Sequence, residues 1–134
     1  MSNHYHLQVR SKHESLSKVM AFINKSYADY FNKKYKLTGH LFEKRYFSKP
    51  AYDEQSNLNL SRYIHRNPVK ADLVKRPEDY RWSSYSFFLQ GEETALPPYM
   101  NITPLLSPFH GSVSEKKQKY IEWARITAKQ LTFI

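Results

Sequence analysis

The sequence contains no cysteine, and that absence excludes several kinds of site. A chain without thiols has no disulfide frame, no cysteine nucleophile and no thiolate zinc site. Long hydrophobic runs are also missing, since none approaches the ~20 residues of a membrane span, and no signal peptide is visible. These features predict a cytoplasmic protein that does not enter a membrane.

Acidic residues are scarce relative to basic ones. Twelve Asp and Glu stand against 21 Lys and Arg, which leaves a net charge of +9 in a chain of 134 residues. The chain also holds eleven tyrosines and eight phenylalanines. Because cations hold phosphates and planar rings stack on bases, nucleic acid is the first partner to consider. The alternative is a basic surface that is merely solvated.

The N-terminal stretch "HYHLQVR" alternates polar and apolar side chains, which predicts a β-strand over residues 4–10. A period of two would place His4 and His6 on one polar face, with Tyr5 pointing into the core. The stretch "HLFEKRYFSK", residues 40–49, predicts a second strand. Two strands are only marginally stable alone, so helices or further strands must complete the sheet.

Apolar residues at three- and four-residue steps predict three amphipathic helices. They cover residues 15–35, 53–66 and 114–131. Pro68 is expected to end the second helix, with Asn67 capping a short helix that follows it.

The chain is expected to divide into a main domain over residues 1–91 and a C-terminal part over residues 92–134. Short helical turns are predicted ahead of Gly91. A proline-containing irregular segment then covers residues 92–113 and leads into the last amphipathic helix.

Tyr63 and Asn67 lie four residues apart, about one helical turn, so both side chains can face one site. A tyrosine hydroxyl, with an ordinary pKa of about 10, is a poor nucleophile unless a cation polarises the bond that it attacks. The imidazoles of His4 and His6 and the amide oxygen of Asn67 would form an open divalent-metal site. In the competing interpretation, Tyr63 is a packing residue and Asn67 a simple helix cap.

Taken together, "HYH", "TGHLFEKRY", "YIHRNPVKADLV" and "WSSY" resemble the single-tyrosine HUH transposases of the insertion-sequence type. The resemblance is strongest to the branch close to the REP-associated tyrosine transposases, and it runs from residue 3 to about residue 91. It implies that His4 and His6 bind the metal, that Tyr63 is the nucleophile and that Asn67 completes the metal shell. Mg²⁺ or Mn²⁺ is the implied ion.

The same resemblance implies a fold and a reaction. The fold is an α+β, ferredoxin-like HUH endonuclease domain, here with an incomplete antiparallel sheet and a C-terminal helical extension. The reaction is metal-dependent nicking and rejoining of single-stranded DNA at hairpins, through a 5′-phosphotyrosine intermediate. Members of this family usually carry a strand, a helix and another strand ahead of the histidine strand. An N-terminal truncation is therefore expected, and a homodimer could pair the open strand edge.

Six basic residues are predicted to bind DNA because they accompany the second strand or the tyrosine helix: Lys44, Arg45, Lys49, Arg62, Arg66 and Lys70. Two other functions stay open beside the transposase. One is a catalytically inactive relic that binds hairpin DNA, and the other is a metal-dependent hydrolase whose cleavage would survive loss of Tyr63.

Overall fold

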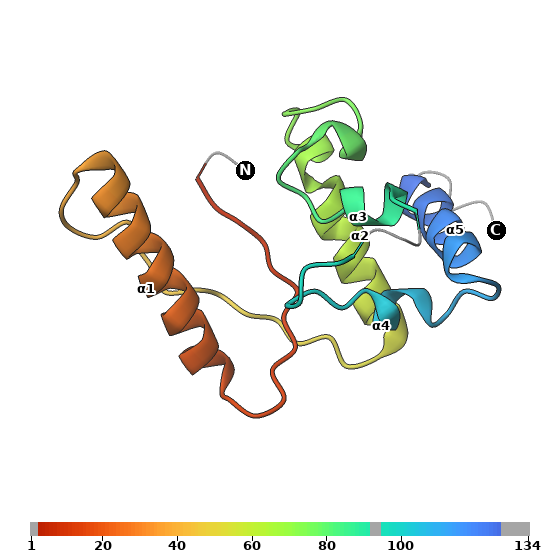
Figure 1. Ribbon diagram of the computed structural model, residues 1–134, viewed down its shortest axis with the longest axis horizontal. Helices are drawn as coiled ribbons and strands as arrows, with labels where there is room; N and C mark the ends of the chain where they lie inside the picture. The colour runs from red at the N-terminus through yellow and green to blue at the C-terminus, as the bar shows by residue number, and fades with distance from the viewer. Residues whose placement is uncertain (1–2, 92–94, 127–134) are drawn as a thin grey trace. The chain divides into compact units, whose positions relative to one another are not determined.

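The computed structural model describes residues 3–91 and 95–126, and it separates into two compact units (Figure 1). The first, the core unit, joins Met1–Gln8 to Ala51–Ile134. The second, the α1 unit, is the intervening Val9–Pro50. Each unit is described here by itself.

The described residues contain helices and no β-strand, so the predicted α+β sheet fold is wrong. Polar and apolar side chains alternate in residues 4–10 and 40–49 as they do in strands. This pattern alone does not provide a second strand with which either segment can pair. A strand needs such a neighbour because its N–H and C=O groups bond across a ladder. Neither segment pairs in this way within the described chain. The first is held to a helix instead, through the side chain of Gln8.

Helix α1 spans Leu16–Tyr35, in agreement with the predicted 15–35. Ser15 caps its start by accepting a hydrogen bond from the Lys18 amide, 3.3 Å away. Lys36 ends it in the left-handed region, with φ of 55°. Met20 is the one residue of α1 that is buried, so this long helix contributes little to any core.

Helix α2 spans Glu54–Lys70, and the prediction that Pro68 would end it is wrong. Proline removes only its own amide donor, so the surrounding carbonyls can still be used. The Ala71 amide donates to the Asn67 carbonyl and the Leu73 amide to the Pro68 carbonyl, each at 2.9 Å. Asn67 therefore lies inside α2 and does not cap a following helix.

Four further helical segments complete the core unit: η1 (Pro77–Asp79), α3 (Ser86–Leu89), α4 (Thr103–Leu106) and α5 (Val113–Arg125). The first two are the helical turns expected before Gly91. Helix α4 lies in the stretch predicted to be irregular. The predicted last helix begins as expected, with Ser112 and Glu115 forming a reciprocal cap. Residues 127–131 of that prediction lie outside the described residues.

One hydrophobic core holds these helices together. Four helices, α2, α3, α4 and α5, supply its buried members, together with the residues directly before α3 and α4. These members are Leu58, Tyr85, Phe88, Ile102, Leu106, Tyr120, Ile121 and Ala124. Tyr120 is fully buried and stacks on Phe88, with ring centroids 4.1 Å apart. The tyrosine helix is thus packed against C-terminal residues far along the chain.

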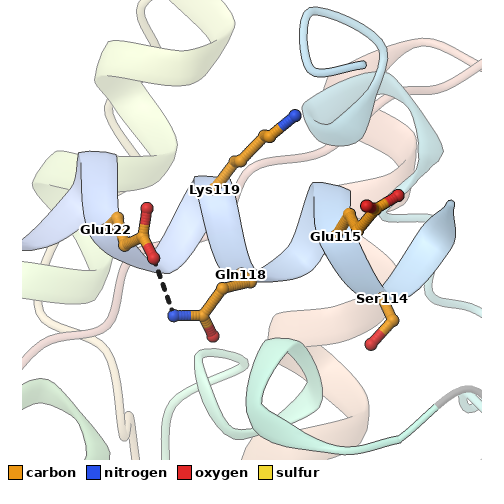
Figure 2. Close-up of a pocket in the computed structure, with 5 residues that line it drawn as sticks. All are labelled: Ser114, Glu115, Gln118, Lys119 and Glu122. Carbon is orange, nitrogen blue, oxygen red and sulfur yellow. Dashed lines mark hydrogen bonds between the residues drawn. The ribbon is translucent and has the colours of Figure 1, made fainter. Parts of the chain in front are cut away.

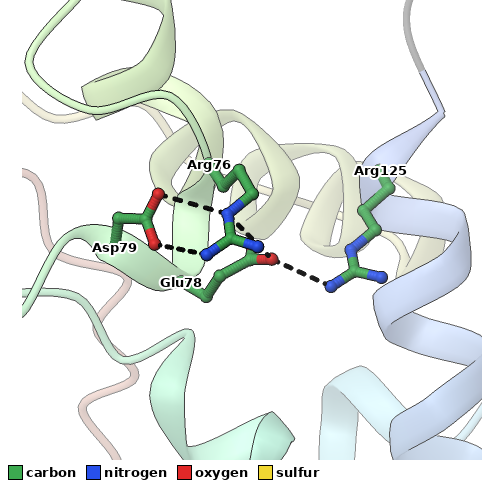
Figure 3. Close-up of polar contacts among 4 residues, drawn as sticks. All are labelled: Arg76, Glu78, Asp79 and Arg125. Carbon is green, nitrogen blue, oxygen red and sulfur yellow. Dashed lines mark hydrogen bonds and ion pairs between the residues drawn. The ribbon is translucent and has the colours of Figure 1, made fainter.

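An ion-pair cluster ties the end of α5 to η1 (Figure 3). Arg125 donates to the Glu78 carboxylate over 3.0 Å, and Arg76 pairs with Asp79 over 2.9 Å. The Arg76–Asp79 pair is exposed to solvent and contributes no more than about 1 kcal/mol. The Glu78 side chain is only 18% exposed, so the pair that it forms with Arg125 is partly shielded from water. In the described chain, no helix combines the length and the apolar character needed to cross a membrane.

Candidate functional site

The structure brings His4, His6 and Tyr63 together within the core unit. The rings of His4 and His6 are 5.1 Å apart between centroids and nearly perpendicular, so both imidazoles lie on one side of the N-terminal segment. The His6 ring meets the edge of the Tyr63 ring at a centroid distance of 5.5 Å. A row of three rings results, with the tyrosine of α2 at one end.

The side chain of Gln8 fixes the N-terminal segment on α2. Its amide donates to the Asn57 carbonyl over 3.2 Å and to the Asn57 side-chain oxygen over 3.1 Å. Gln8 thus meets the first half of α2, whereas His6 meets Tyr63 nearer the helix C-terminus. The segment therefore runs antiparallel to α2, and that direction places the histidines at the tyrosine.

The Tyr63 side chain is available to a ligand. It is 49% exposed, and its hydroxyl makes no hydrogen bond within the described residues. The neighbouring His6 is different, because its Nε2 atom is buried and lacks a hydrogen-bond partner in the described part of the chain. Partial burial, followed by the nearby His4, lowers the pKa of His6. Both effects favour the neutral imidazole, which is the form that binds a metal.

Asn67 lies one helical turn beyond Tyr63 on α2, as the spacing predicts, but it is only 8% exposed. No hydrogen bond joins its side chain to either histidine. The described residues also contain no group of three His, Cys, Asp or Glu side chains close enough to hold a metal. A cation here would thus rest on His4 and His6, with the Asn67 amide as the remaining candidate ligand.

This donor set fits a divalent cation that also binds phosphate. Two imidazole ligands fill only part of an octahedral coordination shell, so the remaining positions stay open to water or phosphate oxygens. The unpartnered Nε2 of His6 is the observation that supports this fit, because a buried nitrogen without a partner is costly. The metal roles of His4, His6 and Asn67 remain predictions.

Arg62 and Arg66, two of the predicted DNA-binding residues, are engaged within the protein. Both donate to the Ile126 carbonyl just beyond α5. Arg66 also donates to the Arg125 carbonyl over 2.9 Å, and the Arg62 guanidinium lies 5.2 Å from the Trp123 ring centroid. Cations at a helix C-terminus satisfy carbonyls that have no partner inside the helix. Lys70, the third basic residue of α2, is exposed.

The other three predicted DNA-binding residues, Lys44, Arg45 and Lys49, belong to the α1 unit. All three are exposed. Their unit is far more basic than the other: Val9–Pro50 holds ten of the 21 basic residues and three of the twelve acidic ones, so it carries seven of the nine net positive charges. Most of the net positive charge thus lies outside the unit that contains Tyr63.

A buried polar network on the core-facing side of α2 was not predicted from the sequence. The two ring nitrogens of His65 lie 2.8 Å from the hydroxyls of Tyr120 and Ser84. The Tyr120 hydroxyl also lies 2.5 Å from that of Ser61. Burial lowers the pKa of His65 to about 4 and raises the pKa of Tyr120 well above its usual range. The available signal was the position of His65 on the apolar face of α2, four residues after Ser61.

A shallow pocket on the outer face of α5 contains none of the predicted site residues (Figure 2). Its lining mixes both signs of charge: Ser114, Glu115, Gln118, Lys119 and Glu122. Gln118 donates to Glu122 over 2.9 Å within it. These are successive turns of one exposed helix face, and such a face has no convergent groups for chemistry.

Comparison with known proteins gives one family. The family described as "Transposase IS200 like" matches residues 1–67, which is half of the chain. The match includes both histidines, Tyr63 and Asn67. Searches of curated proteins and of solved structures found no match.

Proposed function

This chain belongs to the IS200-like transposase family, and we propose that it nicks and rejoins single-stranded DNA through Tyr63. Membership of the family makes the chain a DNA-processing protein. The finer proposal concerns the nucleophile, the metal ligands and the form of the DNA. DNA that folds into a hairpin, with unpaired bases beside it, is the proposed substrate.

The observation that supports this proposal best is the contact of His6 with Tyr63. A tyrosine that was only a packing residue would be expected to bury its ring among apolar side chains. Tyr63 is half-exposed and lies against an imidazole whose Nε2 is unpartnered in the described chain. A nucleophile and a candidate metal ligand thus lie within reach of one phosphate.

The proposed cleavage exchanges one phosphate ester for another. The Tyr63 hydroxyl loses its proton to solvent and forms a bond to the phosphorus, while the bond from phosphorus to the 3′ oxygen breaks. The departing 3′ oxygen takes up a proton, leaving a 3′-hydroxyl and a 5′-phosphotyrosine. Attack of a 3′-hydroxyl on that link reverses the exchange and rejoins DNA. Because one ester replaces another, no external energy source is needed.

His4 and His6, with Asn67 as the remaining candidate, would hold the cation. When bound, Mg²⁺ or Mn²⁺ would neutralise charge on the phosphate that is attacked. The protein itself positions the tyrosine, because α2 is packed on one side against α5 and bordered on another by the N-terminal segment. The exposed Tyr63 hydroxyl needs no side-chain rearrangement to meet a strand that approaches from solvent.

The test is covalent capture of labelled hairpin DNA in the presence of Mn²⁺. Wild-type protein is expected to give a protein–DNA band that survives denaturation, and Tyr63→Phe is expected to eliminate it, since one hydroxyl is lost. Tyr99→Phe is the matched control, because Tyr99 is an exposed tyrosine of the same unit. An adduct that persists in Tyr63→Phe would place the nucleophile elsewhere, with Tyr5 and Tyr46 the next candidates.

Two further arms separate the alternatives. Replacing His4 and His6 by Ala is expected to abolish cleavage and leave DNA binding largely intact, as is removal of the cation with a chelator. Tight hairpin binding without any adduct in the wild type would favour a binding protein. Cleavage that survives Tyr63→Phe and releases free ends would favour a hydrolase.

A further inference from the structure

The exposed face of α1 carries a cluster of aromatic rings that the site around Tyr63 does not use. Tyr27, Tyr30, Phe31 and Tyr35 recur along one side of the helix. Tyr27 lies 6.4 Å from Tyr30 and 6.1 Å from Phe31 between ring centroids, and Phe31 lies 4.5 Å from Tyr35. We call these four residues the α1 ring cluster. It lies wholly within the α1 unit.

The rings of the α1 ring cluster are open to solvent in large part. Tyr27, Tyr30 and Tyr35 are 50%, 56% and 54% exposed. Phe42, which follows α1 in the chain, lies next to one end of the cluster, with its ring centroid 6.3 Å from that of Tyr27. Exposed aromatic surface on this scale typically marks an interaction site. The charge around it indicates which kind of partner it fits.

One lysine contacts these rings, and two more lie at the same end of α1. The Lys34 ammonium lies 5.5 Å from the ring centroids of both Tyr30 and Tyr35, and it donates to the Tyr30 hydroxyl over 3.2 Å. Lys33 and Lys36 belong to the same helix end, and none of the three forms an ion pair within the described residues. Lys18 and Lys25, earlier on α1, are by contrast paired with Glu14 and Asp29. The free positive charge of α1 is thus concentrated beside the α1 ring cluster.

Rings interleaved with cations suit a flexible polyanion that carries flat, apolar faces. We propose that the α1 ring cluster binds unpaired DNA bases by stacking, while the lysines at the end of α1 bind the flanking phosphates. The inference rests on the proposed function for DNA as the partner. It adds a second binding surface that selects single strands over duplex, because paired bases do not offer their faces.

Competing occupants of this face differ in what they need from the side chains. A second copy of the chain would bring the same positive charge, seven units per α1 unit, against itself. A protein partner recognised by apolar contact would accept any large apolar side chain in place of tyrosine. Stacking on bases requires a planar ring, and this requirement defines the experiment.

The experiment compares two double variants of Tyr30 and Tyr35 by fluorescence anisotropy with a labelled single strand of thymidines. Replacement of both by Leu keeps apolar surface and helix propensity but removes the rings, so affinity is expected to fall roughly fivefold or more. Replacement of both by Phe keeps the rings and is expected to leave affinity within about twofold. Tyr99→Leu, in the core unit, is the matched control. Circular dichroism checks that α1 is retained.

Three outcomes would overturn the inference. The Leu and Phe variants could bind the single strand with equal affinity, or the Leu variant could lose as much affinity for a duplex as for a single strand of equal length. The third outcome is a dimer, detected by sedimentation, that dissociates when the rings are removed. Covalent capture by Tyr63 is measured in parallel with saturating DNA. An adduct that forms normally while ring loss has no effect on binding rejects only the stacking surface. Ring-dependent binding without any wild-type adduct rejects only the nicking activity.

Discussion

The two units of this chain differ in where their clusters of aromatic rings lie. In the core unit, Tyr85, Phe88 and Tyr120 are almost completely buried and form the centre of the fold. In the α1 unit, three tyrosines of one helix stay half-exposed, and Met20 is that helix's one buried residue. A high aromatic content therefore has two explanations in one molecule. Part of it builds a core, and part of it lies on the surface.

Charge divides along the same line. The α1 unit carries seven of the nine net positive charges, and the larger core unit carries the other two. Within the core unit, Arg62 and Arg66 are engaged by the end of α5. The candidate chemistry and most of the net positive charge thus belong to different units. Substitutions can therefore test each unit separately. Both tryptophans, Trp82 and Trp123, lie in the core unit, so tryptophan fluorescence follows the unfolding of that unit.

The largest expected effect is loss of the core-unit fold when its central ring is removed. Tyr120→Ala deletes a fully buried ring that stacks on Phe88 and reaches Ser61 and His65 through its hydroxyl. We expect the free energy of unfolding to fall by about 3–5 kcal/mol. Urea unfolding followed by tryptophan fluorescence measures the change.

The matched substitution in the other unit is Met20→Ala. It removes the buried residue of α1 and is expected to shift the tryptophan-reported transition by less than about 0.5 kcal/mol, because Met20 and both tryptophans belong to different compact units. Its effect should appear in the helical signal by circular dichroism. Equal shifts of the tryptophan-reported transition in the two variants would show that the units unfold together.

The long helices α1, α2 and α5 were the predictable part of this fold because each has a local cause, whereas α4 was not predicted. The apolar spacing of α1 predicts its start and end within one residue, and Ser15 is the residue that caps it. Pro68 misled because a proline near the end of a helix removes a single donor, and neighbouring amides still use the Asn67 and Pro68 carbonyls. The strands were not predictable in the same way. A strand exists only with a partner, and alternation over residues 4–10 cannot report whether one is present.

The site shows the same limit. Sequence spacing placed Tyr63 and Asn67 one turn apart on one helix, and the strand period placed His4 and His6 together. Both relations hold in the structure. The contact of His6 with Tyr63 depends on the bond between Gln8 and Asn57, 49 residues apart, which no local pattern encodes. Tyr120, one partner of His65, lies in α5, and the carbonyls bonded by Arg66 lie at the end of α5, so sequence-local patterns cannot predict these contacts either.

A second, smaller effect is expected from acid, and it belongs to the core unit. Burial lowers the pKa of His65 to about 4 in the folded protein, against an ordinary value of 6.5. Between these values the unfolded chain binds the additional proton, so stability falls as pH drops from about 6.5 towards 4 and is unaffected by this residue above that window. The full loss is on the order of 3 kcal/mol.

Tryptophan-monitored unfolding between pH 4.5 and 7 measures this loss. The control is His65→Gln, which keeps hydrogen-bonding atoms and does not titrate. It is expected to be less stable than wild type at pH 7 and to show a flatter pH dependence. A variant whose stability falls as steeply as that of the wild type would assign the acid sensitivity to other groups.

The smallest expected effect compares two sets of three charges chosen from the six predicted DNA-binding residues. Each phosphate contact with a single strand contributes about 0.7 to the slope of log affinity against log salt. Neutralising Lys44, Arg45 and Lys49 to Gln is therefore expected to reduce that slope by up to about 2. The same change at Arg62, Arg66 and Lys70 is expected to reduce it by less than about 1, because two of these side chains already serve the end of α5. Anisotropy titrations across a salt series give both slopes. A larger reduction of the slope from the Arg62, Arg66 and Lys70 variant would show that DNA takes these arginines away from the carbonyls at the end of α5. The division of net charge between the units would then not describe how the protein binds DNA.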